Sequence, residues 1–264
     1  MTRLRIAFVL ALLTATTLLT GTLGMSASEI MLSERKSDYW MMGPQTRAMQ
    51  DDDLTNPGML WVLDGEALWQ RKDGAGKSCA DCHGDARISM KAVAVRYPAF
   101  DAGRGRPVDL EERINICRAD RQKATSFAFE SKELLALEAF IGRQSRGMPI
   151  EGANDERSKP FLQAGRDLFN LRQGQLNLSC AQCHDDNWGQ KLAGSPIPQG
   201  HPTGYPLYRL EWQTLGSLQR RLRNCLVGMR AEAYPFGAPE YVNLELYLMW
   251  RARGMTMETP AVRP

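Results

Sequence analysis

Two five-residue motifs carry the most specific chemistry in this sequence. Cys79-Ala-Asp-Cys-His83 and Cys180-Ala-Gln-Cys-His184 each place two thiols and an imidazole within about one turn of a helix. Thiols at this spacing form thioether bonds to the vinyl groups of haem, and the adjacent histidine binds the iron. A closed zinc site would need four ligands, which neither motif supplies. The sequence therefore predicts two covalently bound haem c groups, attached through Cys79, Cys82, Cys180 and Cys183, with His83 and His184 as iron ligands.

The residues themselves leave the sixth ligand of each iron open. The chain has three histidines, and only His201 lies outside the two motifs, so a second histidine cannot complete both sites. Met148 and Met255 occupy matching places and are the ligands expected of a simple electron carrier. Cys117 and Cys225 also match, and they could form a disulfide, stay as buried thiols or bind the two irons as thiolates. A thiolate ligand suits chemistry more than electron carriage, because it lowers the haem potential.

The residues around the motifs occur twice in the same order. The two motifs are 101 residues apart, and each follows a Gly-x-x-Leu-aromatic segment. Arg113 and Cys117 recur 108 residues later as Arg221 and Cys225. This pattern indicates an internal duplication.

Each copy must hold its motif on a small helical framework. Apolar residues recur at helical spacing and predict one buried stripe in each copy: Leu134, Leu137 and Ile141, then Tyr241, Leu244 and Leu248. Strand signals are scarce, and residues 96–109 and 184–206 are rich in Gly, Pro and charged residues, which is typical of loops.

We therefore expect an all-α fold of two tandem class I cytochrome c-like domains, related by internal duplication and preceded by an N-terminal arm. The expected segments are a signal peptide at 1–27, the arm at 28–59, a domain with the first haem at 60–155 and a domain with the second haem at 156–264.

The first residues are typical of an export signal. Two arginines precede an uncharged run at 6–24, and small residues follow it, which predicts a cleavable signal peptide and a periplasmic location. The alternative is a retained membrane anchor, because the uncharged run could just span a bilayer. The formal net charge is +3 and there is no long basic run, so nucleic acid is not an expected partner.

The whole sequence after the signal resembles SoxA, the di-haem cytochrome c subunit of the SoxAX complex of bacterial thiosulfate oxidation. Apart from the two haem motifs, the resemblance rests on four stretches. The first contains Ala48-Met-Gln-Asp-Asp-Asp53 and Asn56-Pro-Gly-Met-Leu-Trp61, and the others are Asn115-Ile-Cys117-Arg, Arg221-Leu-Arg-Asn-Cys225 and Tyr234-Pro-Phe-Gly237. Some members of the family lack the first haem motif, and this chain has it.

The resemblance implies an activity, a ligand set and partners. It implies that His83 and Cys117 bind the first iron, and that His184 and Cys225 bind the second. The second haem is the implied active site, with Cys225 carried as a persulfide and Arg221 in substrate binding. The implied activity is that of an L-cysteine S-thiosulfotransferase, which joins thiosulfate to a cysteine of a SoxYZ-like carrier protein and passes two electrons to a small SoxX-like monohaem cytochrome.

Two other functions compete with this interpretation. A thiosulfate dehydrogenase that couples two thiosulfates into tetrathionate would also pair two c-type haems with a cysteine ligand, and it would need no carrier protein. A plain di-haem electron carrier would use the two methionines instead of the cysteines. In class I cytochromes c the ligand methionine usually precedes the last helix, whereas here the methionines follow it.

Basic residues flank both candidate ligand cysteines. We expect Arg220, Arg223 and Arg230 to crowd around Cys225 together with Arg221, and Arg113, Arg118 and Arg121 to accompany Cys117. A guanidinium can bind the oxygens of a sulfonate in pairs, but both sites are cationic, so charge alone does not choose between them. His201 lies in a proline-rich segment, and we expect it to be an exposed loop histidine rather than a substrate ligand.

Overall fold

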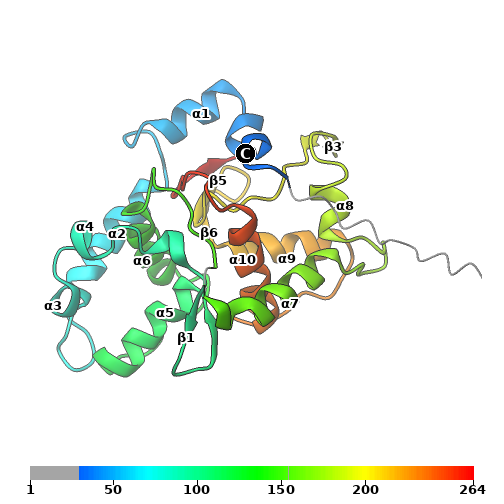
Figure 1. The fold of residues 1–264 in the computed structure, drawn as a ribbon. Helices are drawn as coiled ribbons and strands as arrows, with labels where there is room; N and C mark the ends of the chain where they lie inside the picture. The colour runs from blue at the N-terminus through cyan, green and yellow to red at the C-terminus, as the bar shows by residue number, and fades with distance from the viewer. Residues whose placement is uncertain (1–29, 154) are drawn as a thin grey trace, which may run out of the picture.

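The computed structural model describes residues 30–153 and 155–264, and it is mainly helical, as the sequence predicts (Figure 1). The signal peptide expected at 1–27 lies outside the described residues. In the part that is described, no helix is long and apolar enough to cross a membrane.

The helices and strands fall into an N-terminal arm and two similar series. The arm has two short 3-10 helices (Leu32–Glu34 and Asp38–Met41) and α1 (Pro44–Asp51). The first series is α2 (Met59–Gln70), α3 (Cys79–His83), α4 (Ala86–Ser89), β1 (Ala99–Asp101), β2 (Arg106–Val108), α5 (Leu110–Cys117) and α6 (Lys132–Arg143). The second is α7 (Lys159–Asn170), α8 (Cys180–His184), β3 (Lys191–Leu192), β4 (Ser195–Pro196), β5 (Leu207–Arg209), β6 (Thr214–Gly216), α9 (Leu218–Gly228), α10 (Pro239–Arg251) and β7 (Val262–Arg263).

Each series is built on one close pair of helices. Helix α2 packs on α6, and α7 packs on α10. Both pairs cross at a glycine, because a Cβ at Gly65 would overlap the Ala136 carbonyl and one at Gly165 would overlap the Asn243 carbonyl. The Gly-x-x-Leu-aromatic segment repeated in the sequence is therefore the place where two helix backbones touch.

A short hairpin precedes each of the two helices that contain the candidate ligand cysteines. Strands β1 and β2 pair antiparallel before α5, and β5 and β6 pair antiparallel before α9. Residues 96–109 and 184–206 were expected to be loops. This expectation is wrong for β1 and β2 in the first segment and for β3 and β4 in the second, because these strands are too short to show an alternating pattern. The side chains of Asp109 and Ser217 then accept hydrogen bonds from backbone N–H groups in the first turns of α5 and α9, at 2.6 and 3.2 Å.

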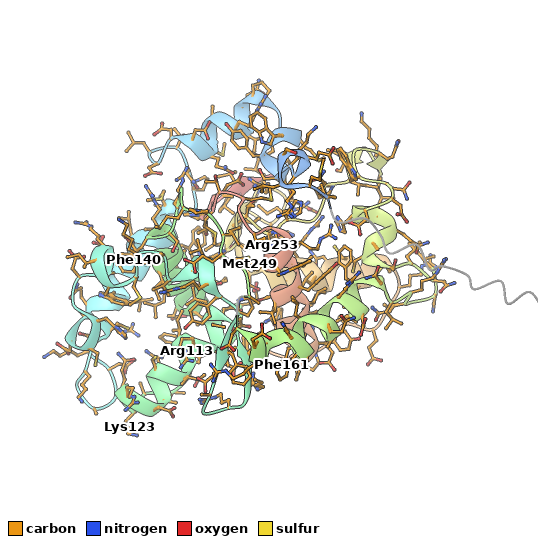
Figure 2. All side chains as sticks on the ribbon, viewed as in Figure 1. Arg113, Lys123, Phe140, Phe161, Met249 and Arg253 are labelled. Atoms are coloured by element: carbon orange, nitrogen blue, oxygen red, sulfur yellow. The ribbon has the colours of Figure 1, made fainter. Side chains whose placement is uncertain are left out.

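The two predicted helical stripes are buried, on α6 and α10. The larger apolar core surrounds α6 and also takes in residues of the second series. Phe140 of α6 and Met249 of α10 both belong to it (Figure 2). The two halves are therefore joined by a continuous apolar core.

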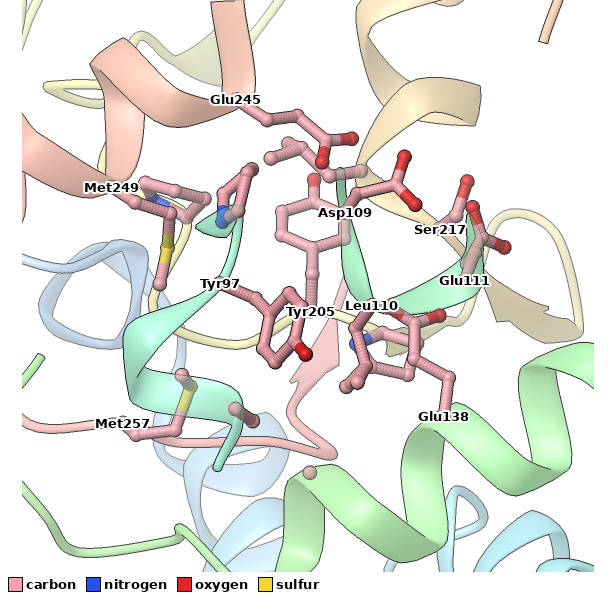
Figure 3. Close-up of a pocket in the computed structure, with 16 residues that line it drawn as sticks. Tyr97, Asp109, Leu110, Glu111, Glu138, Tyr205, Ser217, Glu245, Met249 and Met257 are labelled. Atoms are coloured by element: carbon pink, nitrogen blue, oxygen red, sulfur yellow. The ribbon is translucent and has the colours of Figure 1, made fainter. Parts of the chain in front are cut away.

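A cluster of acids lies beside this core, between the two halves. Asp109, Glu111, Glu138 and Glu245 line a cavity of about 60 Å³, with one member on α10, one on α6 and two at the start of α5 (Figure 3). Burial and the neighbouring carboxylates raise the pKa of Glu111, Glu138 and Glu245 well above the ordinary value, and burial raises that of Asp109 to about 6.

The two ends of the described chain meet on the second half (Figure 1). Strand β7 adds to β5 in parallel, so β6, β5 and β7 form one small sheet. The Gln50 side chain of α1 accepts a hydrogen bond from the Val262 N–H at 3.1 Å. Ser37 donates to Glu258 at 2.6 Å. The arm thus packs on the segment that completes the second hairpin.

Candidate functional site: two cysteine–histidine cavities

The first cavity brings together the first motif and Cys117. Cys79, Cys82 and His83 of α3 line a space of about 540 Å³, and Cys117 lines it from the end of α5. Helix α3 starts at this place because Ser78 and Asp81 form a capping box, in which each side chain accepts a hydrogen bond from the other's backbone N–H. The volume is within the range of cofactor sites.

Two of the four arginines that line the first cavity have carboxylate partners. Arg113 donates to the Asp101 carboxylate at 2.5 Å. Arg118 donates to Asp73 at 2.9 Å, and its guanidinium lies 3.5 Å from the centre of the Phe127 ring. Arg96 and Arg121 also line the cavity and take part in no ion pair among the described residues. Burial raises the pKa of the Cys117 thiol, although Arg113 opposes this effect.

The second cavity brings together the second motif, Cys225 and Arg221. Cys180 and His184 of α8 line a space of about 70 Å³ with Arg221 and Cys225 of α9. Cys183 lies on the same short helix as His184. Ser179 and Gln182 cap this helix as Ser78 and Asp81 cap its counterpart.

His184 is held in a defined orientation. Its Nδ1 donates to the Pro198 carbonyl at 2.7 Å, which leaves Nε2 available as a metal ligand. The ring also hydrogen-bonds the Cys225 side chain. Burial opposes ionisation of the Cys225 thiol, but the hydrogen bond with His184 and the charge of Arg221 outweigh it and lower the pKa of Cys225. The pKa of the Cys225 thiol is thus lowered, whereas that of Cys117 is raised.

Both sets of donors suit a haem c group. Each cavity offers a thiol, a histidine and a facing cysteine, and the first also has the volume that such a group needs. In the second, the His184 and Cys225 side chains contact each other, and both would hold the iron of a bound haem.

The structure does not favour two of the other arrangements considered from the sequence, the disulfide and ligation by methionine. All six cysteines are free, so Cys117 and Cys225 form no disulfide. Met148 and Met255 line neither cavity and pack against the first core instead. The backbones of the segments that carry them are paired, with the Met257 N–H donating to the Met148 carbonyl at 2.9 Å. A haem ligated by these methionines would require this pairing to break.

His201 is not the exposed loop residue that the sequence led us to expect. It is 4 % exposed, it lines the second cavity, and neither ring nitrogen has a hydrogen-bond partner. Burial lowers the pKa of His201 to about 3, so the ring is neutral. The expectation failed because the proline-rich segment runs beneath the chain's last residues, where the Ala261 N–H donates to the Gly204 carbonyl.

Only Arg221 of the arginines expected around Cys225 lines the second cavity. Arg220 stacks on Trp212, with 4.4 Å between the guanidinium and the ring centre. Arg223 stacks on Phe236 and donates to the Tyr234 carbonyl. Arg230 is exposed beyond the end of α9. Helical geometry explains the difference, because Arg221 is one turn before Cys225 and shares its face, whereas Arg220 and Arg223 do not.

Two further residues of the second cavity were not singled out from the sequence. Tyr205 lines it, and its Tyr-Pro pair repeats Tyr97-Pro98 at an offset of 108 residues, which is a signal that the duplication already contained. Asp38 enters from the N-terminal arm, and burial raises the pKa of its carboxyl. No local pattern around Asp38 predicts this contact across the fold.

The repeated attachment motif on a mainly helical fold defines a tandem c-type cytochrome. The sequence model described as "SoxA/TsdA, cytochrome c domain" matches residues 64–150 and again 164–257. The chain belongs to this family, and its curated relatives place it with the SoxA proteins. Haem c binding follows from the cytochrome c domains.

The relatives match over most of their length. The L-cysteine S-thiosulfotransferase subunit SoxA of Pseudaminobacter salicylatoxidans is 39 % identical over 87 % of this chain and 81 % of that protein. The subunit of the same name from Rhodovulum sulfidophilum is 35 % identical over 87 % and 80 %. The fold matches the crystal structure of SoxXA from P. pantotrophus with a TM-score of 0.83 and 31 % identity, covering 87 % of each chain.

Proposed function

We propose that this protein is the haem-bearing catalytic subunit of a periplasmic L-cysteine S-thiosulfotransferase. In this reaction the thiolate of a carrier-protein cysteine and thiosulfate form a carrier–S–S–SO₃⁻ conjugate and release two electrons. The observation that carries the proposal is the second cavity, which holds a cysteine with a lowered pKa and a buried arginine on one face of α9. The relatives of this name support it.

Each residue of the cavity has a role in this proposal. Arg221 binds the sulfonate oxygens through its planar guanidinium. Cys225, as thiolate or persulfide, forms a bond to the outer sulfur of thiosulfate, which keeps its sulfonate, and the two electrons released in this step leave the site. The carrier thiolate then attacks that sulfur and displaces the Cys225 thiolate or persulfide, as in thiol–disulfide exchange. His184 and Cys225 hold the second haem iron, and His83 and Cys117 hold the first. A bound haem supplies a one-electron acceptor for the two electrons released.

The partners follow from the same relatives. We propose a heterodimer with a small SoxX-like monohaem cytochrome, because the matching crystal structure is of a SoxXA complex. A SoxYZ-like carrier protein would present the cysteine. We also propose that residues 1–27 are an export signal, and that the two cytochrome c-like domains extend over residues 60–155 and 156–264.

The test is thiosulfate-dependent reduction of an acceptor cytochrome, with the carrier protein and the small subunit present. We expect Cys225→Ala to reduce turnover to background while both haems stay attached, because the change removes the group that receives sulfur. Full activity in this variant would exclude sulfur transfer at this cysteine and leave an electron carrier. Turnover that persists without the carrier and yields tetrathionate would instead identify a thiosulfate dehydrogenase.

A further inference from the structure

Equivalent residues of the two hairpins stand behind the two arginines. Asp101 is the last residue of β1 and pairs with Arg106 across its hairpin. Arg209 is the last residue of β5 and pairs with Thr214 in the same register, 108 residues later. The duplication therefore puts an acid and a base at the same structural position.

In the first half, this position neutralises the arginine of the haem cavity. Asp101 is 9 % exposed and accepts a hydrogen bond from Arg113 at 2.5 Å. Arg113 also hydrogen-bonds the side chain of Tyr97. The charge of such an arginine, and several of its N–H donors, are already paired with groups of the protein.

In the second half, the same position adds positive charge. Arg209 forms its ion pair with Glu211 at 2.9 Å, and the Glu211 side chain is 66 % exposed. Within the described chain, no carboxylate lies within ion-pair distance of Arg221. The Asp38 carboxyl also faces Arg221, but its strongest attraction is to Arg263.

We propose that the residue at this hairpin position, Asp101 or Arg209, decides which of the two haem cavities accepts the thiosulfate anion. Asp101 occupies Arg113, the counterpart of Arg221, and so withdraws it from an anion in the first cavity. Arg209 leaves the guanidinium of Arg221 available and increases the positive charge around it. This inference rests on the proposed function and adds to it the determinant that separates an active site from its duplicate.

The physical basis is a competition between a carboxylate and a dianion for one guanidinium. A carboxylate partner that is part of the fold is always present at the arginine, so a dilute anion must displace it. Position 209 acts through Arg221 and is a positioning residue, since it does not itself line the cavity.

The experiment for the second cavity compares two substitutions in the holo-heterodimer. Arg209→Asp installs the acid that Arg113 faces, and we expect the KM for thiosulfate to rise about tenfold or more, because that corresponds to one charge-assisted hydrogen bond. Arg209→Asn removes the charge without adding an acid, and its KM should change several-fold less. The kcat should stay within about twofold in both, because the group that receives sulfur is untouched.

Glu211→Gln is the matched control for a purely structural role. It breaks the same ion pair but leaves the cation, so the KM should not rise. If Arg209→Asp and Arg209→Asn raise the KM equally, or if Glu211→Gln raises it as much, the inference fails.

The experiment for the first cavity is Asp101→Asn, followed by calorimetric titration of the oxidised holo-heterodimer with sodium thiosulfate in the absence of carrier. We expect a second binding site, absent from the wild type, because Arg113 loses its fixed partner. No second site would overturn the inference for this cavity.

The two proposals can fail separately. If the wild type binds thiosulfate in a manner that depends on Arg209 but never conjugates it to the carrier, the proposed function fails and the inference stands. If the wild type conjugates thiosulfate and Arg209→Asp leaves the KM unchanged, the proposed function stands and the inference fails.

Discussion

Arg221 and Cys225 lie one turn apart on α9, so a single helix fixes the distance between the group that binds an anion and the group that receives sulfur. Arg113 and Cys117 have the same spacing on α5. What differs between the two pairs is their surroundings, because Arg113 has an internal carboxylate partner and Arg221 does not. Side-chain partners, rather than the motif itself, therefore distinguish the two sites.

Substitution of Arg221 should weaken the binding of thiosulfate. Arg221→Ala removes a charge-assisted hydrogen bond, worth about 1.5–3 kcal/mol, so kcat/KM should fall roughly ten- to hundred-fold. Arg221→Lys keeps the charge but loses the planar fork, and it should recover only part of the loss. Steady-state kinetics with the carrier present measure both, and Arg230→Ala, at an exposed site just beyond the end of α9, is the control. Equal losses in Arg221→Ala and Arg230→Ala would contradict the assignment.

Cys117 should ligate the first iron. Its thiol faces the first attachment motif across the cavity, as Cys225 faces the second. The EPR spectrum of the oxidised holoprotein should then contain two thiolate-type low-spin signals, and Cys117→Ala should abolish one of them. Survival of both signals in the variant would show that another group binds this iron.

The helix crossings are the tightest contacts between elements. At Gly165, an added methyl group would meet backbone and the Tyr247 side chain, and neither can move away easily. Gly165→Ala should therefore lower the free energy of unfolding of the holoprotein by about 1–3 kcal/mol, as overpacking does. Gly228→Ala, on α9, is a matched control because nothing lies within 4 Å of its added Cβ. Urea denaturation measures both, and equal midpoints would show that the crossing can relax.

The buried acids between α5, α6 and α10 should make stability depend on pH. A carboxyl whose pKa is raised in the fold binds its proton more tightly there than in the unfolded chain. The stability it contributes is full below its ordinary pKa, 4.5 for Glu111, and is lost as the pH rises through the raised value. Burial is the main cause for Glu111, followed by repulsion from Glu138, Asp109 and Glu245. Unfolding should therefore become easier between about pH 5 and 8.

Glu111→Gln tests this cluster. Gln219 occupies the equivalent place in the second half, where its side chain bonds Asp109 at 2.8 Å and the Gly237 N–H at 2.8 Å, so an amide is compatible with the site. The variant should be more stable than the wild type at pH 8, by about 1–3 kcal/mol, with a flatter pH profile. Glu133→Gln, on the exposed face of α6, should leave the profile unchanged. A wild-type profile that is flat over this range would refute the expectation.

At the scale of the whole molecule, the chain should carry two covalent haems. Helices α3 and α8 are capped in the same way, and each carries an attachment motif beside its own cavity. After acid–acetone extraction the colour should stay with the protein, and the intact mass should exceed that of the processed chain by two haem groups. An excess of one haem group, or of none, would refute this prediction.

The sequence predicted more of the framework than of the surroundings of the sites. The repeated motifs indicated the helical fold, the buried stripes and the two cavities, because covalent attachment and helix packing both depend on local spacing. The partners of individual side chains were not predictable in the same way. Whether Arg223 faces Cys225 or Phe236 depends on helix rotation, and the burial of His201 depends on residues about 60 positions later in the chain. Contacts of that kind arise from tertiary packing and leave no local pattern.

The small sheet of the second half has a consequence for the order in which the molecule assembles. The first hairpin is complete with two strands, whereas the second gains β7 from the end of the described chain. Strand β7 in turn donates a hydrogen bond to the Gln50 side chain of α1, near the beginning of that chain. A chain that emerges N-terminus first presents every element of the first half before β7 exists, and closing such a long loop is slow. The first haem cavity can therefore mature early. The hairpin behind the second becomes fixed only after the last residues arrive, when both ends of the described chain close on it.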